Sequence, residues 1–491
     1  MKKPQLNKNI LHRLLNFLTL SFLFISFIDF DGNKNITTKA STLNKKQTEL
    51  VLKASISDKE RKLPLYGFNG NNVKGPSWTN SSFRDAAASL HFKIIRYPGG
   101  TVCNWWDWQK GWFVDNPALP DKFKKMRYVP NGLKELKLLV DETNCDVLFT
   151  LNMISSSLQD QIAMLTYAQS LKIPIKWVEL GNEFNNFKNP GRQNFSTVED
   201  YGKTCKQWID AIKSHFPNVR IAVIGGNRNY NADVKNWNNI VLKNAPNADA
   251  IVAHLYPKTD NILDDSGINF QKLFEECYNN GFNNQGFNSI KDKSIWVTEF
   301  NINWASNKNN EIDENDNKII APKANTWSQT LATLLMTSIA TSISPNTTLI
   351  LNHNISGAPT FAAIESEKQS FQKMPNGIGM SAWLMASDHM NSLAKINFTK
   401  DHNQSLQDYE LLGWKFSNNK SSSILLVNLL NSPIKINLSA FVNTDATFET
   451  KYASKNSIIN STADVKYKTG ILNNGLIELP EYSFTIIKTH Q

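Results

Sequence analysis

The stretch Ile175-Lys-Trp-Val-Glu-Leu-Gly-Asn-Glu-Phe184 carries the strongest structural signal in the chain. It reads as a short, mostly buried strand that ends at Gly181, with Asn182 and Glu183 directly after it. In a barrel of parallel strands, residues at the carboxyl ends of the strands face the active site. The stretch therefore predicts a barrel strand that brings a carboxylate and an amide to the mouth of the barrel.

A second stretch, Ser294-Ile-Trp-Val-Thr-Glu-Phe-Asn-Ile302, has the same pattern, because its buried run ends at Glu299. The chain between Glu183 and Glu299 is long enough for three strand–helix units. Strands that far apart in sequence lie on opposite sides of an eight-stranded barrel. We therefore expect the two carboxylates to face each other across one barrel mouth.

Buried runs alternate with helical patterns through most of the chain. Expected barrel strands are 65–69, 93–97, 146–152, 175–183, 220–224, 250–256, 294–302 and 348–352, and expected helices include 83–90, 133–140, 158–171, 196–216 and 327–341. This pattern predicts an α/β fold, a (β/α)8 TIM barrel over residues 49–390. A doubly wound open sheet gives the same alternation, but it rarely needs eight strands and no Gly-rich phosphate loop follows a strand here.

The pattern changes after residue 391, where helical periodicity is absent. Short strands are expected at 409–416, 423–427, 434–438 and 483–487, separated by turns rich in Asn and Ser. They predict a C-terminal antiparallel β-sandwich over 391–491. A further strand at 49–56 is expected to join it. The sandwich is either a structural support or a separate carbohydrate-binding module.

The N-terminus combines a basic start, Met1-Lys-Lys3, with an apolar run over 14–28. This pattern is typical of a secretory signal peptide or an uncleaved signal anchor over 1–30, followed by a polar linker over 31–48. We expect an exported protein (secreted, periplasmic or at the cell surface). If the signal is cleaved, no stable membrane insertion is expected.

Charge and cysteine content narrow the function classes. The formal net charge of +10 comes from scattered residues, and no nucleic-acid-binding module is present. The four cysteines, Cys103, Cys145, Cys205 and Cys277, form no CxxC motif, which disfavours a zinc site. Two alternatives remain for these cysteines: two of them form a disulfide, or they are buried free thiols. The acidic run over 303–318 lacks the spacing of a calcium loop, and a solvated loop is expected there. No cofactor or metal is expected.

Two facing carboxylates without a metal motif or a Ser or Cys nucleophile pattern favour cleavage of glycosidic bonds. One carboxyl group must donate a proton to the leaving oxygen, and the other must attack the anomeric carbon as a carboxylate. In retaining enzymes the two groups lie about 5–5.5 Å apart. We assign Glu183 as the acid/base and Glu299 as the nucleophile.

Several motifs also resemble a known group of enzymes. They are Leu-Gly-Asn-Glu at 180–183, Thr-Glu-Phe-Asn at 298–301, Arg96-Tyr-Pro-Gly-Gly100, His254-x-Tyr256 and Leu479-Pro-Glu-Tyr-Ser-Phe484. The chain from about residue 50 to its end resembles clan A of the retaining glycoside hydrolases, in particular the α-L-arabinofuranosidases and their heparanase-like and β-glucuronidase relatives. The motifs are typical of the clan and do not select one substrate.

The resemblance implies roles for residues around the two glutamates. Asn182 would hydrogen-bond the sugar 2-hydroxyl, and Arg96 would hold Glu299 ionised through a charge-assisted bond. Tyr256 would donate a hydrogen bond to the nucleophile, and His254 would line the same wall.

The loop after the second strand, Asn104-Trp-Trp-Asp-Trp-Gln-Lys-Gly-Trp-Phe113, contains four tryptophans. Sugar rings present apolar faces that pack on aromatic rings, so we expect Trp105 and Trp106 to contact substrate and Asp107 to bind a sugar hydroxyl. The alternative is that these side chains pack the loop onto the barrel.

The sequence thus predicts an exported retaining glycoside hydrolase that acts on a poly- or oligosaccharide, arabinofuranosidase-like by its motifs. An endo-acting glycanase or a glucuronidase of the same clan stays open as an alternative. So does a non-catalytic saccharide-binding protein with the same fold. The sugar, the linkage, the choice of exo or endo action and the oligomeric state are not determined by the sequence.

Overall fold

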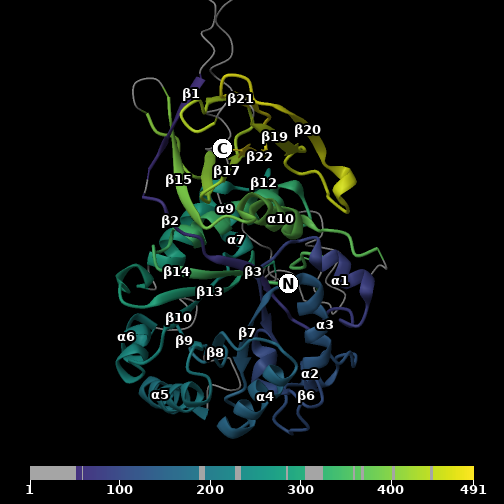
Figure 1. Ribbon diagram of the computed structural model, residues 1–491, viewed down its shortest axis with the longest axis vertical. Coiled ribbons are helices and arrows are strands. Elements are labelled where there is room, and N and C mark those ends of the chain that lie inside the picture. The colour runs from purple at the N-terminus through teal and green to yellow at the C-terminus, as the bar shows by residue number, and fades with distance from the viewer. Residues whose placement is uncertain are drawn as a thin grey trace, which may run out of the picture. The chain divides into compact units, whose positions relative to one another are not determined.

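Eight parallel strands of the described chain close into a barrel, drawn purple to teal in Figure 1. They are β3 (Leu65–Asn69), β4 (Ile94–Tyr97), β7 (Asp146–Leu151), β8 (Trp177–Leu180), β9 (Arg220–Ile224), β10 (Ala250–Leu255), β13 (Ser294–Phe300) and β14 (Thr347–Asn352). Each strand pairs with the next, and β14 pairs back onto β3. The predicted TIM barrel is confirmed, with every expected strand in place.

The computed structural model describes residues 51–57, 59–186, 194–226, 234–283, 286–304, 324–357, 360–365, 370–400, 404–442 and 446–490. The expected signal segment (1–30) and linker (31–48) lie outside these residues, as does most of the acidic run over 303–318. In the part of the chain that is described, no helix is long and apolar enough to cross a membrane.

Helices surround the barrel in the expected alternation. The main ones are α1 (Ser81–Ala88), α3 (Leu133–Thr143), α4 (Leu158–Ser170), α5 (Val198–His215), α6 (Val234–Asn244), α8 (Phe270–Glu275), α9 (Trp327–Ser342) and α10 (Pro375–Ser387). In α5, Thr197 and Asp200 form a capping box that starts the helix one residue after the beginning of the expected segment 196–216. Its apolar face, which includes Tyr201, is buried against the barrel.

The C-terminal strands, together with β1 and β2, form one continuous ten-stranded sheet in the described chain, drawn green to yellow in Figure 1 except for the purple β1 and β2. They are β1 (Val51–Ile56), β2 (Arg61–Lys62), β15 (Ser392–Thr399), β16 (Leu411–Ser417), β17 (Ser421–Asn428), β18 (Ile434–Asn437), β19 (Thr447–Tyr452), β20 (Lys466–Ile471), β21 (Leu476–Leu479) and β22 (Ser483–His490). The sheet curls around its own apolar core, so a single sheet supplies both layers of the expected sandwich.

The sheet domain begins with the N-terminal strand of the described chain. β1 pairs antiparallel with β15 and parallel with β18, and therefore lies inside the sheet and not at its edge. Leu52 of β1 belongs to the buried core of this domain. The sheet is thus mixed rather than purely antiparallel.

Helices α9 and α10 lie between the barrel and the sheet (Figure 1). Both are buried on almost every face, because α9 contacts β14 of the barrel and α10 contacts β17 and β22 of the sheet. The indole nitrogen of Trp327 in α9 donates a hydrogen bond of 2.5 Å to the carbonyl oxygen of Tyr482. These contacts attach the sheet to the side of the barrel.

Candidate active site

Arg96 lies at the centre of the barrel near its carboxyl end. On β4, Ile94 belongs to the barrel interior and Ile95 to the outer core, so the alternation of the strand turns Arg96 inward. Its side chain is fully buried. Its Nη1 donates to Glu299 Oε1 at 2.5 Å, and its Nη2 donates to the side-chain oxygen of Asn182 at 2.7 Å. The guanidinium therefore links the two stretches that the sequence singled out.

Glu179, which the sequence analysis did not select, is the second carboxylate bound to Arg96. Two parallel hydrogen bonds of 2.8 and 2.7 Å run from Arg96 Nε and Nη2 to the Glu179 carboxylate. The side chain is fully buried, because β8 alternates Val178 and Leu180 outward and Glu179 inward. Glu179 could have been recognised from the sequence as a charged residue within an otherwise apolar strand. Such a buried charge is normally paired with an opposite charge.

The backbone at the end of β8 aims Glu183 into the mouth of the barrel. Gly181 has φ +80, and a Cβ there would lie 2.3 Å from the ring of Phe184. Glu183 itself adopts φ +52, a left-handed conformation that costs a non-glycine residue roughly 1–3 kcal/mol. Its carboxylate is partly accessible and its Oε1 lies 2.9 Å from His254 Nδ1.

A β-bulge turns Glu299 into the barrel. Ala253 pairs with Val297 but His254 pairs with Glu299, so Thr298 is the extra residue in β13. Simple alternation from the inward Trp296 would have pointed Glu299 outward. The bulge thus places the carboxylate beside Arg96.

Besides Arg96 and His254, whose Nδ1 lies 3.8 Å from Oε2, three described side chains surround the Glu299 carboxylate. Tyr256 donates from its hydroxyl to Oε2 at 2.7 Å, and Asn69 Nδ2 donates to Oε1 at 3.0 Å. His353 Nδ1 lies 3.8 Å from Oε2 and 2.9 Å from Asn69 Nδ2. Asn69 and His353 were not expected from the sequence, because each stands among other polar residues where its strand ends and only the closed barrel brings it beside Glu299.

The surroundings of Glu299 favour its ionised form. Burial by itself would raise the pKa of Glu299, but the charges of His254, His353 and Arg96 and the Tyr256 hydrogen bond outweigh burial. The pKa of Glu299 is therefore held well below its ordinary value. Burial and the charge of Glu299 raise the pKa of Tyr256 well above its usual range, so the phenol stays protonated and donates.

His254 contacts Glu183 and the bulge of β13. Its Nε2 lies 3.1 Å from the Thr298 hydroxyl, opposite the nitrogen that faces Glu183. Burial lowers the pKa of His254, but the neighbouring Glu299 and Glu183 carboxylates reverse this effect and raise the pKa overall. The imidazole is thus positioned between the two glutamates.

Asn182 lies beneath the mouth of the barrel, where it is almost completely buried. Besides its bond to Arg96, it accepts a 3.3 Å hydrogen bond on its backbone oxygen from Asn104 Nδ2. These contacts fix the turn that carries Glu183.

A cavity of about 470 Å³ opens over the two glutamates. Glu183, Tyr256, Glu299 and His353 line its floor. Its remaining lining comes from Asn71, Lys74, Gly100, Thr101, Val102, Lys122, Phe123, Met126, Asn303, Asn354 and Phe361. The cavity is large enough for one or two sugar rings, since small-molecule sites are commonly about 300–1,000 Å³.

Trp105, Trp106 and Asp107 do not line this cavity. The indole of Trp106 packs edge-on against Tyr97 and donates to its hydroxyl at 3.2 Å. Trp105 is buried, and Asp107 accepts hydrogen bonds from the backbone N–H groups that follow it. The loop therefore packs as the short hairpin of β5 (Trp106–Asp107) and β6 (Trp112–Phe113).

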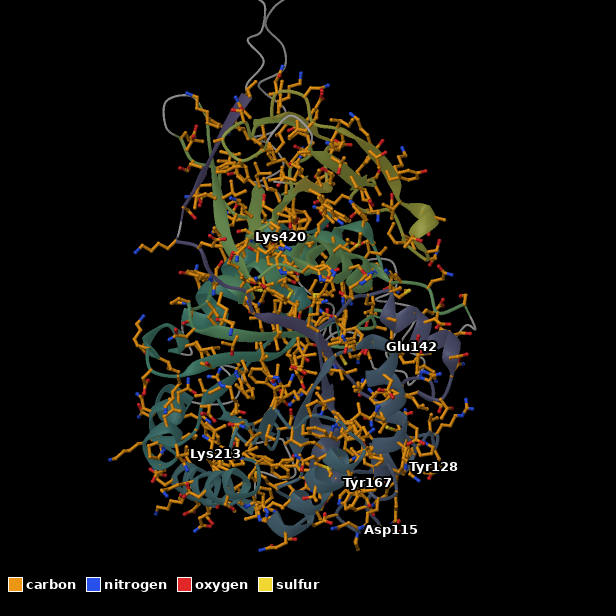
Figure 2. All side chains as sticks on the ribbon, in the orientation of Figure 1. Asp115, Tyr128, Glu142, Tyr167, Lys213 and Lys420 are labelled. Carbon is orange, nitrogen blue, oxygen red and sulfur yellow. The ribbon has the colours of Figure 1, made fainter. Side chains whose placement is uncertain are left out.

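The physical reason is that the hairpin has its own aromatic core, in which Trp106 and Trp112 pack on Phe113. Asp115 and Tyr128, from the same connection, lie at the outer edge of the barrel (Figure 2). The wall of the cavity is built instead by residues before and after the hairpin.

All four cysteines are buried free thiols, so no disulfide links them.

Glu183, His254 and Glu299 each offer one potential metal-ligating atom, and these three atoms lie within 4.8 Å of one another. The contacts around them favour a proton-transfer site over a cation site. Arg96 already places a positive charge on Glu299 Oε1, and Tyr256 donates to Oε2. A divalent cation bound here would be repelled by the guanidinium.

Comparison with solved structures places this barrel and sheet beside known enzymes. The α-L-arabinofuranosidase of Thermotoga maritima, solved with arabinose, superposes with a TM-score of 0.67 over 90% of this chain and 100% of that chain, at 16% identity. The GH51 α-L-arabinofuranosidase of Thermotoga petrophila RKU-1 gives a TM-score of 0.68 with the same coverage and identity. The chain has the fold of the α-L-arabinofuranosidases.

A glucuronidase shares this arabinofuranosidase fold more distantly. The 4-O-α-L-rhamnosyl-β-D-glucuronidase of Fusarium oxysporum 12S gives a TM-score of 0.56 at 14% identity, over 89% of this chain and 100% of that chain. In sequence, an intracellular exo-α-(1→5)-L-arabinofuranosidase of Acetivibrio thermocellus is 23% identical over 207 residues. That match spans 38% of this chain and 41% of the relative. No family model matches the chain. The resemblance to both enzyme groups expected from the motifs is confirmed.

Proposed function

We propose that the protein is a retaining glycoside hydrolase, with Glu183 as acid/base and Glu299 as nucleophile. The observation that carries the proposal is the spacing of the two carboxylates: one oxygen of Glu183 lies within 4.8 Å of one oxygen of Glu299. Retaining enzymes hold the two groups about 5–5.5 Å apart, whereas inverting enzymes leave about 6.5–9.5 Å for a water molecule. The spacing favours direct attack by a carboxylate.

The proposed reaction proceeds in two displacements. Glu299 attacks the anomeric carbon while Glu183 donates its proton to the leaving glycosidic oxygen, which gives a covalent glycosyl-enzyme. Glu183, now a carboxylate, then takes a proton from water as the water oxygen attacks the same carbon and releases Glu299. The two inversions restore the starting configuration.

The residues around Glu299 serve both steps in this proposal. Arg96, Asn69 and Tyr256 keep the nucleophile ionised and fix its orientation. The same donors stabilise the carboxylate that leaves when the intermediate is hydrolysed. Asn182 would contact the sugar 2-hydroxyl only after a shift toward the cavity, because it does not line the cavity and its amide oxygen accepts from Arg96.

The substrate proposed first is an α-L-arabinofuranoside in a poly- or oligosaccharide, because the similar structures and the curated relative are named for that activity. A glucuronidase activity is the second candidate, favoured by the structural likeness to the Fusarium oxysporum enzyme. We further propose export, on the basis of the basic and apolar N-terminal pattern.

A hydrolysis screen tests the proposal. Wild type, Glu299→Gln and Glu183→Gln are assayed on aryl glycosides of arabinose, xylose, galactose, glucose and glucuronic acid, and on polysaccharides. We expect Glu299→Gln to lose roughly 10⁴–10⁶-fold in kcat on every substrate. Glu183→Gln should lose about 10²–10⁴-fold with poor leaving groups but much less with dinitrophenyl glycosides, which need no proton.

Glu478→Gln is the matched control, because Glu478 is exposed on β21 of the sheet domain. It should keep wild-type rates. Wild-type turnover that survives in Glu299→Gln would refute the nucleophile assignment. Glycan binding by wild type without any turnover would favour a non-catalytic saccharide-binding protein.

A further inference from the structure

Two lysines are among the residues that line the cavity over the glutamates. Lys74 follows β3 and Lys122 belongs to α2 (Asp121–Lys124), and both side chains are exposed. Among the described residues, neither lysine has a carboxylate within ion-pair distance. In contrast, Lys124 on the same helix pairs with Asp121 at 3.2 Å. The cavity lining therefore includes two lysines that form no ion pair with a described carboxylate, on a wall that also carries Glu183 and Glu299.

The position of Lys74 is fixed by its neighbours. A Cβ added to Gly357 would lie 3.0 Å from the Lys74 Cβ, which shows that the stem of the lysine packs on the loop after β14. Lys74 reaches solvent, but the protein packed around it partly desolvates its ammonium group and lowers the pKa of Lys74, and the charge of Lys122 lowers that pKa further. An anion bound between the two lysines would relieve both effects.

Asn354 supplies a second, independent observation. Its side chain is completely buried and lines the same cavity, yet neither its amide nitrogen nor its amide oxygen has a hydrogen-bond partner. A buried amide left unpaired is costly, and native proteins rarely leave one without a ligand or water to bind. Asn354 also lies close to Lys74. A Cβ added to Gly357 would lie 3.7 Å from Asn354 Nδ2 and 3.0 Å from the Lys74 Cβ.

The position of Lys74 and Asn354 relative to Glu299 indicates which part of a bound sugar they contact. Asn354 directly follows His353, whose Nδ1 lies 3.8 Å from Glu299 Oε2. β14 lies opposite β8 in the barrel order, so Asn354 and Glu183 approach the bound sugar from opposite sides. A group that reaches Lys74 and Asn354 therefore belongs to the sugar next to Glu299 and points away from the departing oxygen.

We propose that Lys74, Lys122 and Asn354 form a subsite for an acidic group on the sugar bound at Glu299, either the carboxylate of a uronic acid or a sulfate ester. This inference rests on the proposed glycosidase function and favours its second candidate, a sugar that carries an acidic group, over the neutral arabinofuranoside. Lys74 and Lys122 supply the charge, and the Asn354 amide donates a hydrogen bond to one oxygen of the anion.

Binding measured without turnover tests the subsite. Glu299→Gln protein is run by affinity electrophoresis in gels that contain neutral polysaccharides (arabinan, xylan), carboxylated ones (polygalacturonate, alginate) or sulfated ones (carrageenan, chondroitin sulfate). We expect retardation by a carboxylated or a sulfated glycan, and the arm that responds identifies the acidic group. Adding Lys74→Met should weaken that binding about tenfold or more, whereas Lys74→Arg should retain it.

Lys124→Met is the control, because it removes the same charge from α2 without touching the cavity lining. It should change binding less than twofold. Equal weakening by Lys74→Met and Lys124→Met, or binding to neutral glycans alone, would overturn the inference. The proposed function is tested separately: wild-type hydrolysis of neutral arabinosides at a rate unchanged by Lys74→Met would sustain it and refute the subsite. Lys74-dependent binding without hydrolysis of any glycan would sustain the subsite and refute the proposed function.

Discussion

Arg96 is a buried cation whose charge is compensated inside the barrel by two carboxylates. Glu179 holds it through a bidentate pair, which leaves Nη1 free to orient Glu299. Removing one partner of a buried ion pair is strongly destabilising, because the remaining charge stays desolvated. Glu179 is therefore a positioning residue for the nucleophile, although it does not line the cavity.

Glu179→Gln tests this role through stability and activity together. The variant should lose about 3 kcal/mol of unfolding free energy in urea denaturation, and kcat should fall because Arg96 can shift away from Glu299. The exposed Glu478→Gln should change stability by less than about 0.5 kcal/mol. A Glu179→Gln protein as stable as the control would contradict the charge balance described for Arg96.

Tyr256→Phe removes a donor to Glu299 and should shift the acid limb of the pH profile. The pKa of Glu299 is depressed, so the carboxylate stays ionised as pH falls below the usual range of a glutamate. Loss of a hydrogen bond to the charged form raises that pKa, and the acid limb of kcat/KM should move about 1 unit to higher pH.

The comparison variant is Tyr128→Phe, since Tyr128 lies at the outer edge of the barrel (Figure 2). Its pH profile should match wild type. An acid limb that stays in place in Tyr256→Phe would show that another group titrates there.

At the scale of the element, two local irregularities set the geometry of the mouth. The bulge at Thr298 turns Glu299 inward, and Gly181 allows the chain to turn sharply before Glu183. Neither strand would present its glutamate to the cavity with regular β geometry. Such departures from regular backbone are common next to active sites.

Gly181→Ala should therefore lower activity, although Gly181 has no side chain that could take part in the reaction. The new methyl group would meet the Phe184 ring and would also strain a left-handed backbone. We expect kcat to fall at least tenfold and the unfolding free energy to drop by about 2 kcal/mol. Gly286→Ala carries a similar positive φ, but its added Cβ would meet only Ser289 Oγ, at an ordinary contact distance of 3.8 Å, so it should lose about 1 kcal/mol and keep its kcat. Equal kcat for both variants would contradict this account of the turn.

The barrel strands could be predicted from the sequence because strands buried on both faces read as continuous apolar runs. Helix α10 could not, since a helix buried on every face has no polar stripe and hence no period. The strand β20 (Lys466–Ile471) was not predicted either, for the opposite reason: nearly all of its residues are exposed, so it has no apolar run. Glu183 and Glu299 stood out at the ends of their strands, but Asn69 and His353 become recognisable only when the barrel closes around them.

The whole molecule depends on β1, which lies within the sheet of the C-terminal domain. It joins β15 to β18, and without it the pair of β18 and β21 would lose its connection to the other strands. The two ends of the described chain are thus held in one structure. The sheet supports the barrel through α9 and α10.

Truncation tests this dependence. A chain that begins at residue 47 should melt at the wild-type Tm, whereas one that begins at residue 59 should melt about 10 °C lower or fail to fold, because Leu52 leaves the core of the sheet domain. Circular dichroism melting of both chains measures the difference. Equal Tm values would show that β1 contributes little to the fold.

The central claim is that Glu299 forms a covalent bond to the sugar while Glu183 moves the proton. The most direct test is inactivation by a 2-deoxy-2-fluoro dinitrophenyl glycoside of the sugar that wild type hydrolyses, followed by peptide mass spectrometry. We predict one fluoroglycosyl group on the peptide that contains Glu299 and none on Glu183. A label on another residue, or first-formed sugar of inverted configuration with no label, would contradict the claim.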